Sequence, residues 1–233
     1  MALHLHPNHR CRGSATPPPH LVSYIDNAIR AAYKDPVGRR DFALAADGGR
    51  ISPKLTSSFD SSPVSPPRRP ENILDEDLRS GVCWLFPGDH GQVGIKIPQF
   101  IHPTHFTIDH IPHEIAADIR QAPRELVLWG VVDGSPNWRV YKDVRDSLQQ
   151  SLLDAAGDAP PMVADKATFL PLAVVEYNIR KDFHIQTFPL HPAITSTQMY
   201  FGAFVLEVRS NWGGSVTKVY RVRIHGEEVY ASS

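Results

Sequence analysis

Short stretches of alternating apolar and polar residues, divided by prolines and glycines, dominate the chain after Asp41. Side chains alternate across a β-strand, and Pro and Gly interrupt strand pairing, so each stretch predicts one strand. Short strands at this spacing predict an all-β fold, an antiparallel β-sandwich of the jelly-roll kind. The stretches are Gly91–Ile97, Thr104–Ile111, Glu125–Val132, Leu172–Ile179, His184–Leu190, Tyr200–Ser210 and a terminal strand that follows Gly213-Gly214 and stops at His225-Gly226.

Two segments have a helical period instead. From Leu21 to Tyr33 the apolar residues fall on one face of a helix. A helix of this length is marginal alone, so it packs either on the domain or on copies of itself. Apolar residues also recur every four positions within residues 139–157, which predicts one helix inserted between two strands.

These patterns divide the chain into three parts. We expect a disordered tail over residues 1–20, a short helix within 21–40 and a β-domain over 41–233, with its insertion at about 134–168. The tail mixes His, Pro and Arg, and the spacing of its histidines and Cys11 fits no closed zinc motif.

Composition narrows the functional class. The 233 residues are 42% hydrophobic and 21% charged, which is typical of a globular protein. The formal net charge of -1 gives no indication of a nucleic-acid partner. The apolar runs are far shorter than the roughly 18 residues of a membrane helix, so no span is expected within this chain. The start has no apolar core of signal-peptide length, and the chain as given is expected to be soluble.

Motifs of catalysis are missing from the sequence. It has no Gly-x-Ser-x-Gly elbow, P-loop, His-Glu-x-x-His or Gly-rich dinucleotide turn. Cys83 stands beside apolar residues, which favours a packed thiol over a nucleophile. Asp109 and His110 are neighbours in a predicted strand and point to opposite faces, and so do His105 and His110. We therefore do not expect an enzyme.

Six motifs follow one another in an order that resembles the SUN domain, the C-terminal module of nuclear-envelope SUN proteins. The resemblance covers about Asp41 to Gly226 and leaves the inserted helix outside. The motifs are FALAADGGRI (42–51), GVCWLFPGDHGQVGIKI (81–97), IHPTHFTIDHIP (101–112), QAPRELVLWG (121–130), IQTFPL (185–190) and RSNWGGSVTKVYRVRIHG (209–226).

The resemblance implies a β-sandwich that works as a homotrimer on an upstream coiled coil. Such a domain lies in the perinuclear space and binds the luminal C-terminal tail of a KASH protein, so that the LINC complex joins nucleoskeleton to cytoskeleton. Typical members carry a membrane span before the coiled coil, which would place a longer form of this chain in the inner nuclear membrane. A peptide can be held by added strand pairing, and its carboxylate by converging donors.

The resemblance also implies the residues of the peptide pocket. His110 and Tyr220 correspond to the pocket residues, and both side chains can donate to a carboxylate. Gln121 stands where many animal members have Ser, and Val216 stands where an aromatic residue is common. These two departures leave open which peptide sequence this chain prefers.

The resemblance also indicates that two disulfide bonds typical of the family cannot form in this chain. Thr56, or a neighbour, replaces the cysteine that would link covalently to a KASH protein, and Lys218 replaces the partner of Cys83. Residues 57–72 stand at the position of the family's KASH lid. Prolines in this segment lack the N–H groups of a hairpin ladder, so it is either a loop that the peptide orders or a flexible linker.

The segment NILDEDLRSGVC (72–83) resembles the cation loop of the family. Backbone carbonyls around Ile73, Asp75, Asp77 and Val82, with the Tyr220 carbonyl, would hold a monovalent ion such as potassium. The two acidic side chains make calcium conceivable, because hard cations favour oxygen ligands. An acidic surface turn is the alternative.

A rival interpretation comes from the predicted fold itself. Jelly-roll sandwiches often bind sugars, so a carbohydrate- or glycoprotein-binding module is the alternative to a KASH-binding adaptor. Exposed aromatic residues on one loop edge would favour sugar, whereas a groove that ends at Tyr220 and His110 would favour a peptide terminus.

Overall fold

The structure, a computed structural model, describes residues 18–32, 37–59, 68–157, 159–162 and 167–229. The chain divides into two compact units, Met1–Gly38 and Arg39–Ser233. The first unit contains helix α1 (Pro19–Ala32), so the predicted N-terminal helix is confirmed. None of the described helices is both long and apolar enough to cross a bilayer. The predicted tail, with its histidines and Cys11, lies outside the described residues.

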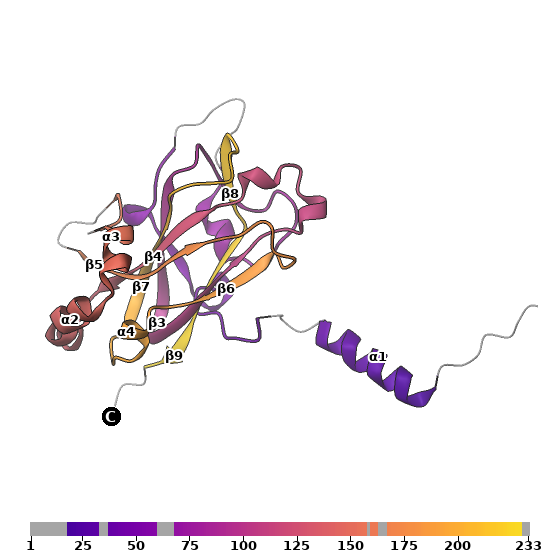
Figure 1. The fold of residues 1–233 in the computed structure, drawn as a ribbon, viewed down its shortest axis with the longest axis horizontal. Helices are drawn as coiled ribbons and strands as arrows, with labels where there is room; N and C mark the ends of the chain where they lie inside the picture. The colour runs from indigo at the N-terminus through magenta and orange to yellow at the C-terminus, as the bar shows by residue number, and fades with distance from the viewer. Residues whose placement is uncertain (1–17, 33–36, 60–67, 158, 163–166, 230–233) are drawn as a thin grey trace, which may run out of the picture. The chain divides into compact units, whose positions relative to one another are not determined.

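The second unit consists mainly of antiparallel strands, which confirms the all-β sandwich (Figure 1). Seven strands form one sheet, in the order β1-β3-β7-β4-β5, with β6 and β9 also paired to β3, while β2 pairs with β8. The strands are β1 (Arg50–Ser52), β2 (Trp84–Pro87), β3 (Gly91–Asp109), β4 (Glu125–Val132), β5 (Thr168–Glu176), β6 (Ile185–Pro189), β7 (Phe201–Val208), β8 (Val216–Val219) and β9 (Arg221–Glu228).

Strand β3 serves both layers of the sandwich, because its two halves have different partners. Gly91–Lys96 pairs with β7, and also with β1, whereas Ile101–Asp109 pairs with β9 and in part with β6. The register shifts where the halves meet, and such irregularities let a strand bend from one sheet into another. The sequence predicted two strands here, Gly91–Ile97 and Thr104–Ile111, divided by prolines; the structure has one strand that bends.

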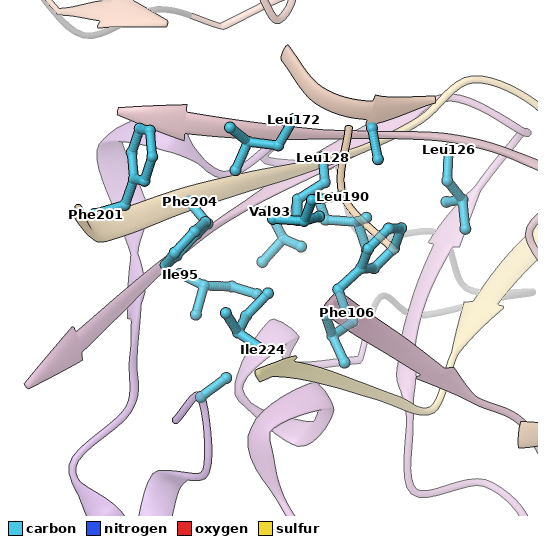
Figure 2. Close-up of a cluster of buried hydrophobic side chains, with 14 of the residues drawn as sticks. Val93, Ile95, Phe106, Leu126, Leu128, Leu172, Leu190, Phe201, Phe204 and Ile224 are labelled. Atoms are coloured by element: carbon cyan, nitrogen blue, oxygen red, sulfur yellow. The ribbon is translucent and has the colours of Figure 1, made fainter. Parts of the chain in front are cut away.

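The apolar core lies between these layers (Figure 2). Val93 and Ile95 from the first half of β3 face the same cluster as Phe106 from the second half and Ile224 from β9. Strands β4, β5 and β7 contribute Leu126, Leu128, Leu172, Phe201 and Phe204. Burying one such side chain stabilises the fold by roughly 1.5–3 kcal/mol, so this cluster holds the two layers together.

The terminal segment forms two strands instead of the one that was predicted. β8 pairs with β2, whereas β9 pairs with β3, and Tyr220 stands between them. The alternation of side chains continues across Tyr220, so a period of two cannot reveal the break. Tyr220 is therefore the residue at which the chain passes from one sheet into the other.

An Asn-Trp-Gly-Gly corner fixes the start of β8. The Asn211 side-chain nitrogen donates to the Val216 carbonyl at 3.2 Å, and its oxygen accepts from the Gly213 amide at 2.8 Å. Gly213 has a φ of 101°, which favours glycine at this position. The Trp212 indole donates to the Tyr177 carbonyl at 3.0 Å. The corner thus ties β8 to the segment that follows β5.

The insertion is helical, as predicted, but it contains two helices, α2 (Ser135–Ser147) and α3 (Gln150–Ala156). Leu148 between them is extended, with ψ of 142°, and its buried side chain joins the core. α2 contacts β4, and α3 contacts β5, as Figure 1 shows. A further short helix, α4, spans Pro192–Thr195.

Strand β9 carries two arginines into the interior. The Arg223 guanidinium donates to both oxygens of Asp109, with Nε at 3.1 and 3.0 Å, and these residues are 3% and 0% exposed. Arg221 donates to Asp41 at 2.9 Å, and both side chains are buried. The second pair fixes the beginning of the domain on β9.

Candidate functional site

His110 and Tyr220 lie against each other at one end of β3. Asp109 is opposite Arg221 in the pairing of β3 with β9, so the next position on each side brings His110 opposite Tyr220. Their ring centroids are 4.8 Å apart, and the rings meet edge to face at 71°. Strand register alone therefore joins two residues that are far apart in the sequence.

His110 is buried and electrically neutral at pH 7. Its Nδ1 lies 3.0 Å from the carbonyl oxygen of Ile111, and because a carbonyl only accepts, Nδ1 carries the proton. Burial lowers the pKa of His110 to about 4, and the charges of His184 and Lys218 act in the same direction. Its Nε2 is buried and has no hydrogen-bond partner among the described residues. A buried polar atom of this kind calls for a ligand or another explanation.

The lowered pKa of His110 should make the stability of the fold depend on pH. The unfolded chain takes up a proton below about pH 6.5, whereas folded His110 resists it down to about pH 4, so stability falls as the pH drops through this window. We expect a loss of about 2 kcal/mol from this group between pH 7 and pH 5. Urea denaturation of the wild type and of His110→Gln at both pH values measures it. An equal loss in the two proteins would show that His110 does not cause it.

Tyr220 is also buried, at 1% exposed. Burial raises the pKa of its phenol, and hydrogen bonding with the Gly81 backbone and the Ser80 side chain opposes this only in part. The phenol therefore keeps its proton at neutral pH and can donate. Both groups belong to the Ser80-Gly81 turn, which lies within hydrogen-bonding reach of the hydroxyl.

Val216 packs beside Tyr220 in a small apolar cluster that also contains Cys83, Leu85 and Ile111. Cys83 is fully buried, and burial raises the pKa of its thiol. A buried neutral thiol is inert, as expected for a packed cysteine. The cluster forms the apolar wall behind Tyr220.

Gln121 borders the same region through Gly214, which precedes β8. A Cβ atom on Gly214 would lie 2.8 Å from Cγ of Gln121, and the Gln121 side-chain oxygen is buried without a partner among the described residues. Thr56 lies elsewhere in a structural role: its hydroxyl donates to the Ser52 carbonyl at 2.8 Å and accepts from the Gly94 amide at 3.1 Å.

Both ends of the segment at the lid position are attached to β2. Phe59 stacks on Phe86, with centroids 5.1 Å apart, and the Arg68 amide donates to the Leu85 carbonyl at 3.0 Å. Residues 60–67 lie outside the described residues, so whether this segment orders on a peptide stays a prediction.

The expected cation loop follows directly, and its acidic side chains are engaged within the loop. Asp75 accepts from the Asp77 amide at 3.2 Å, and Asp77 forms an ion pair with Arg79, whose Nε lies at 2.9 Å. Ile73 is buried in the core, while no cluster of three or more His, Cys, Asp or Glu suited to a metal occurs among the described residues. With these two carboxylates engaged, the expected ligands are the backbone carbonyls around Ile73, Asp75, Asp77 and Val82 and the Tyr220 carbonyl, and the bound cation stays a prediction.

Removal of monovalent and divalent cations should therefore lower the melting temperature. A ligand that binds only the folded state stabilises it by about 1.4–2.7 kcal/mol at 10 to 100 times its Kd. Differential scanning fluorimetry in potassium and in an organic cation measures the effect, and Asp77→Ala should reduce it if this side chain holds the loop. Identical melting curves with and without the ions would show that the loop is an ordinary acidic turn.

An open pocket of about 220 Å³ lies next to His110. It is lined by residues of two loops: Ile111, Pro112, His113, Glu114, Ile119, Tyr177, Asn178, Ile179, Arg180, Lys181, Asp182 and His184. The Tyr177 ring is 6.0 Å from the His110 ring, and the His110 amide donates to the His184 carbonyl at 3.0 Å. Sequence reasoning did not find Tyr177, because no motif marks it and only the fold brings it to His110.

Comparison with known proteins gives one family. Residues 65–148 and 164–228 match the family model described as Sad1/UNC-like C-terminal. The chain is 25% identical over 219 residues to human SUN domain-containing protein 1, covering 88% of this chain and 24% of that protein. It is 28% identical over 212 residues to human SUN domain-containing protein 5, covering 85% and 46%. The chain thus spans between about a quarter and a half of the length of these relatives.

Solved structures share the fold at low sequence identity. The family 32 carbohydrate-binding module of Streptococcus pneumoniae EndoD has a TM-score of 0.51 at 12% identity, covering 81% of this chain and 100% of the module. Allantoicase has a TM-score of 0.50 at 14% identity, covering 87% of this chain and 53% of that one. These likenesses establish the sandwich fold alone.

Proposed function

Because this chain belongs to the Sad1/UNC-like C-terminal family, the SUN-domain family, we propose that it is the peptide-binding part of a nuclear-envelope adaptor. Its ligand is the luminal C-terminal tail of a KASH protein in the perinuclear space. The pair links nucleoskeleton to cytoskeleton in a LINC complex, and the adaptor carries out no chemistry.

The observation that carries the proposal is the buried pair of His110 and Tyr220. His110 has a ring nitrogen without a partner among the described residues, and the phenol beside it keeps its proton. A terminal carboxylate would accept from the Tyr220 hydroxyl once the Ser80-Gly81 turn has opened. Val216 forms the apolar wall, and Gln121, whose buried side-chain oxygen has no partner among the described residues, packs against Gly214 before β8.

The role of His110 in this pocket depends on its proton. With Nδ1 bonded to Ile111, Nε2 holds a lone pair in the neutral ring and cannot donate to a carboxylate. Charging a ring whose pKa is about 4 costs about 4 kcal/mol at pH 7. At neutral pH, therefore, Tyr220 is the donor of this pair, and His110 donates only if the bound carboxylate raises its pKa.

The proposal includes a homotrimer built on a longer coiled coil than α1 alone. The apolar face of α1 is accessible, with Leu21 at 42%, Tyr24 at 72% and Ile25 at 44% exposed. Copies of the same helix would cover this face. A sequence of this length is short for a coiled coil, which usually needs three or more heptads.

Isothermal titration calorimetry tests the proposal with the full chain and a proline-rich peptide that ends in a free carboxylate. Tyr220→Phe should weaken binding while the fold is kept, because only the hydroxyl is removed. Cys83→Ser is the matched control: it changes the same apolar cluster and should leave affinity nearly unchanged, because Thr56 offers no covalent link.

A further inference from the structure

Strand β8 presents Val216, Lys218 and Tyr220 on one face, because side chains alternate along a strand. Val216 and Tyr220 both belong to the apolar cluster around Cys83. Lys218 lies between them, opposite Leu85 of β2, and is half-buried. This register and half-burial place the lysine stem beside the apolar wall of the proposed pocket, where an ammonium group would reach toward solvent at the edge of the wall.

The ammonium group of Lys218 has no carboxylate partner among the described ion pairs. Asp118 lies close enough to feel its charge, but that carboxylate is held by Arg120 at 2.9 and 3.0 Å. The other cation near Tyr220 is Arg68, whose guanidinium donates to the Gly81 carbonyl. Lys218 is thus a positive charge without a carboxylate partner in the part of the chain that the structure describes.

The electric effect of Lys218 reaches the groups of the proposed pocket. Burial is the main cause of the lowered pKa of His110 and of the raised pKa of Cys83; the positive charge of Lys218 adds to the lowering of the His110 pKa and opposes the rise of the Cys83 pKa. His110 and Tyr220 are uncharged at pH 7, and the Arg68 guanidinium near Tyr220 is engaged by the Gly81 carbonyl. A carboxylate that enters a buried neutral pocket needs a cation to compensate its loss of solvation.

From this geometry we infer that Lys218 binds the terminal carboxylate of the peptide and determines the preference for a free C-terminus. The inference rests on the proposed function and assigns recognition of the negative charge of the peptide to one residue, Lys218. The family resemblance expects a cysteine here, bonded to Cys83, so this chain has a permanent cation where the typical member has a neutral disulfide. The ligand class is an unmodified, negatively charged peptide terminus.

Calorimetry with acid and amide forms of one proline-rich peptide tests the inference in a double cycle. Lys218→Met keeps an unbranched stem on the apolar wall and removes the charge, and it should weaken the acid form about tenfold while the amide form changes little. Lys218→Arg should keep the preference. Lys142→Met, which removes an exposed charge on α2, is the control for a general loss of positive charge. Melting curves of each variant check that the fold is intact.

The outcomes separate the inference from its premise. The role of Lys218 is supported if the ratio of the affinities for the acid and amide peptides falls in Lys218→Met but not in the other variants. The affinity of Lys218→Met for the acid peptide should also depend less on salt concentration. An unchanged ratio, or an equal loss for both peptides, overturns it while the proposed function stands. If the wild type binds neither peptide, the proposed function fails, and the role of Lys218 fails with it.

Discussion

Arg223→Met should lower the free energy of unfolding by about 3–5 kcal/mol, because it leaves the Asp109 carboxylate buried without its cation. Asp109 is 0% exposed, and Arg223 contacts both of its oxygens. A charge in this position cannot be solvated, and its hydrogen bonds with the guanidinium are lost. Urea denaturation at pH 7 measures the change.

Two further variants make this prediction specific to the buried pair. Asp109→Leu combined with Arg223→Met removes both charges and should recover much of the loss, since an apolar pair replaces an ionic one. Arg120→Met breaks the ion pair with Asp118, whose side chains are 66% and 27% exposed, and should cost less than about 1 kcal/mol. If Arg223→Met and Arg120→Met lowered the free energy of unfolding equally, burial would not explain the importance of the Asp109–Arg223 pair.

Local pattern identified most strands but not the way in which they are shared between layers. The alternation from Gly91 to Ile97 and from Thr104 to Ile111 is real, yet Pro98 and Pro103 bend one strand instead of ending two. β2 was missed as a strand, because Trp84–Pro87 is nearly all apolar and has no alternation. Both the continuous strand β3 and the strand β2 are determined by pairing with segments far away in the sequence. A short stretch of sequence contains no information about such pairing.

The site residues were reached through the family resemblance, and the structure adds their physical state. The register of β3 with β9 brings His110 against Tyr220, but the tautomer of His110 and its low pKa depend on Ile111, on burial and on neighbouring charges. No sequence motif encodes these. The hydrogen-bonding groups beside Tyr220 likewise belong to a turn, Ser80-Gly81, that the sequence suggested only as part of a cation loop.

The rival interpretation, a sugar-binding module, rests on the fold alone. The likeness to a carbohydrate-binding module has 12% identity and concerns the arrangement of strands. Exposed aromatic residues would favour sugar: Phe183 is 77% and Trp138 is 49% exposed, but they stand on different loops or helices of the domain. The case for a peptide terminus rests instead on the family of the chain and on the buried Tyr220 phenol, which keeps its proton and can donate to a carboxylate.

The peptide's terminal carboxylate should dominate its affinity. A charge-assisted hydrogen bond contributes on the order of 1.5–3 kcal/mol, and Tyr220 supplies one from a buried phenol. Amidation removes the negative charge and replaces one acceptor oxygen by an NH2 group. That group cannot accept the proton that the Tyr220 hydroxyl donates. We expect a loss of about tenfold or more in affinity. Tyr220→Phe should reproduce part of this loss for the acid form.

The most direct test is calorimetric titration of the full chain with one KASH-like peptide in its acid and amide forms, at pH 7 and equal ionic strength. The account predicts binding of the acid form, and an affinity for the amide form that is lower by about tenfold or more. Equal affinity for the two forms would contradict the assignment of the carboxylate to the pocket at Tyr220 and His110. Binding to neither peptide, beside clear binding to a glycan, would contradict the adaptor function itself and favour the sugar-binding module.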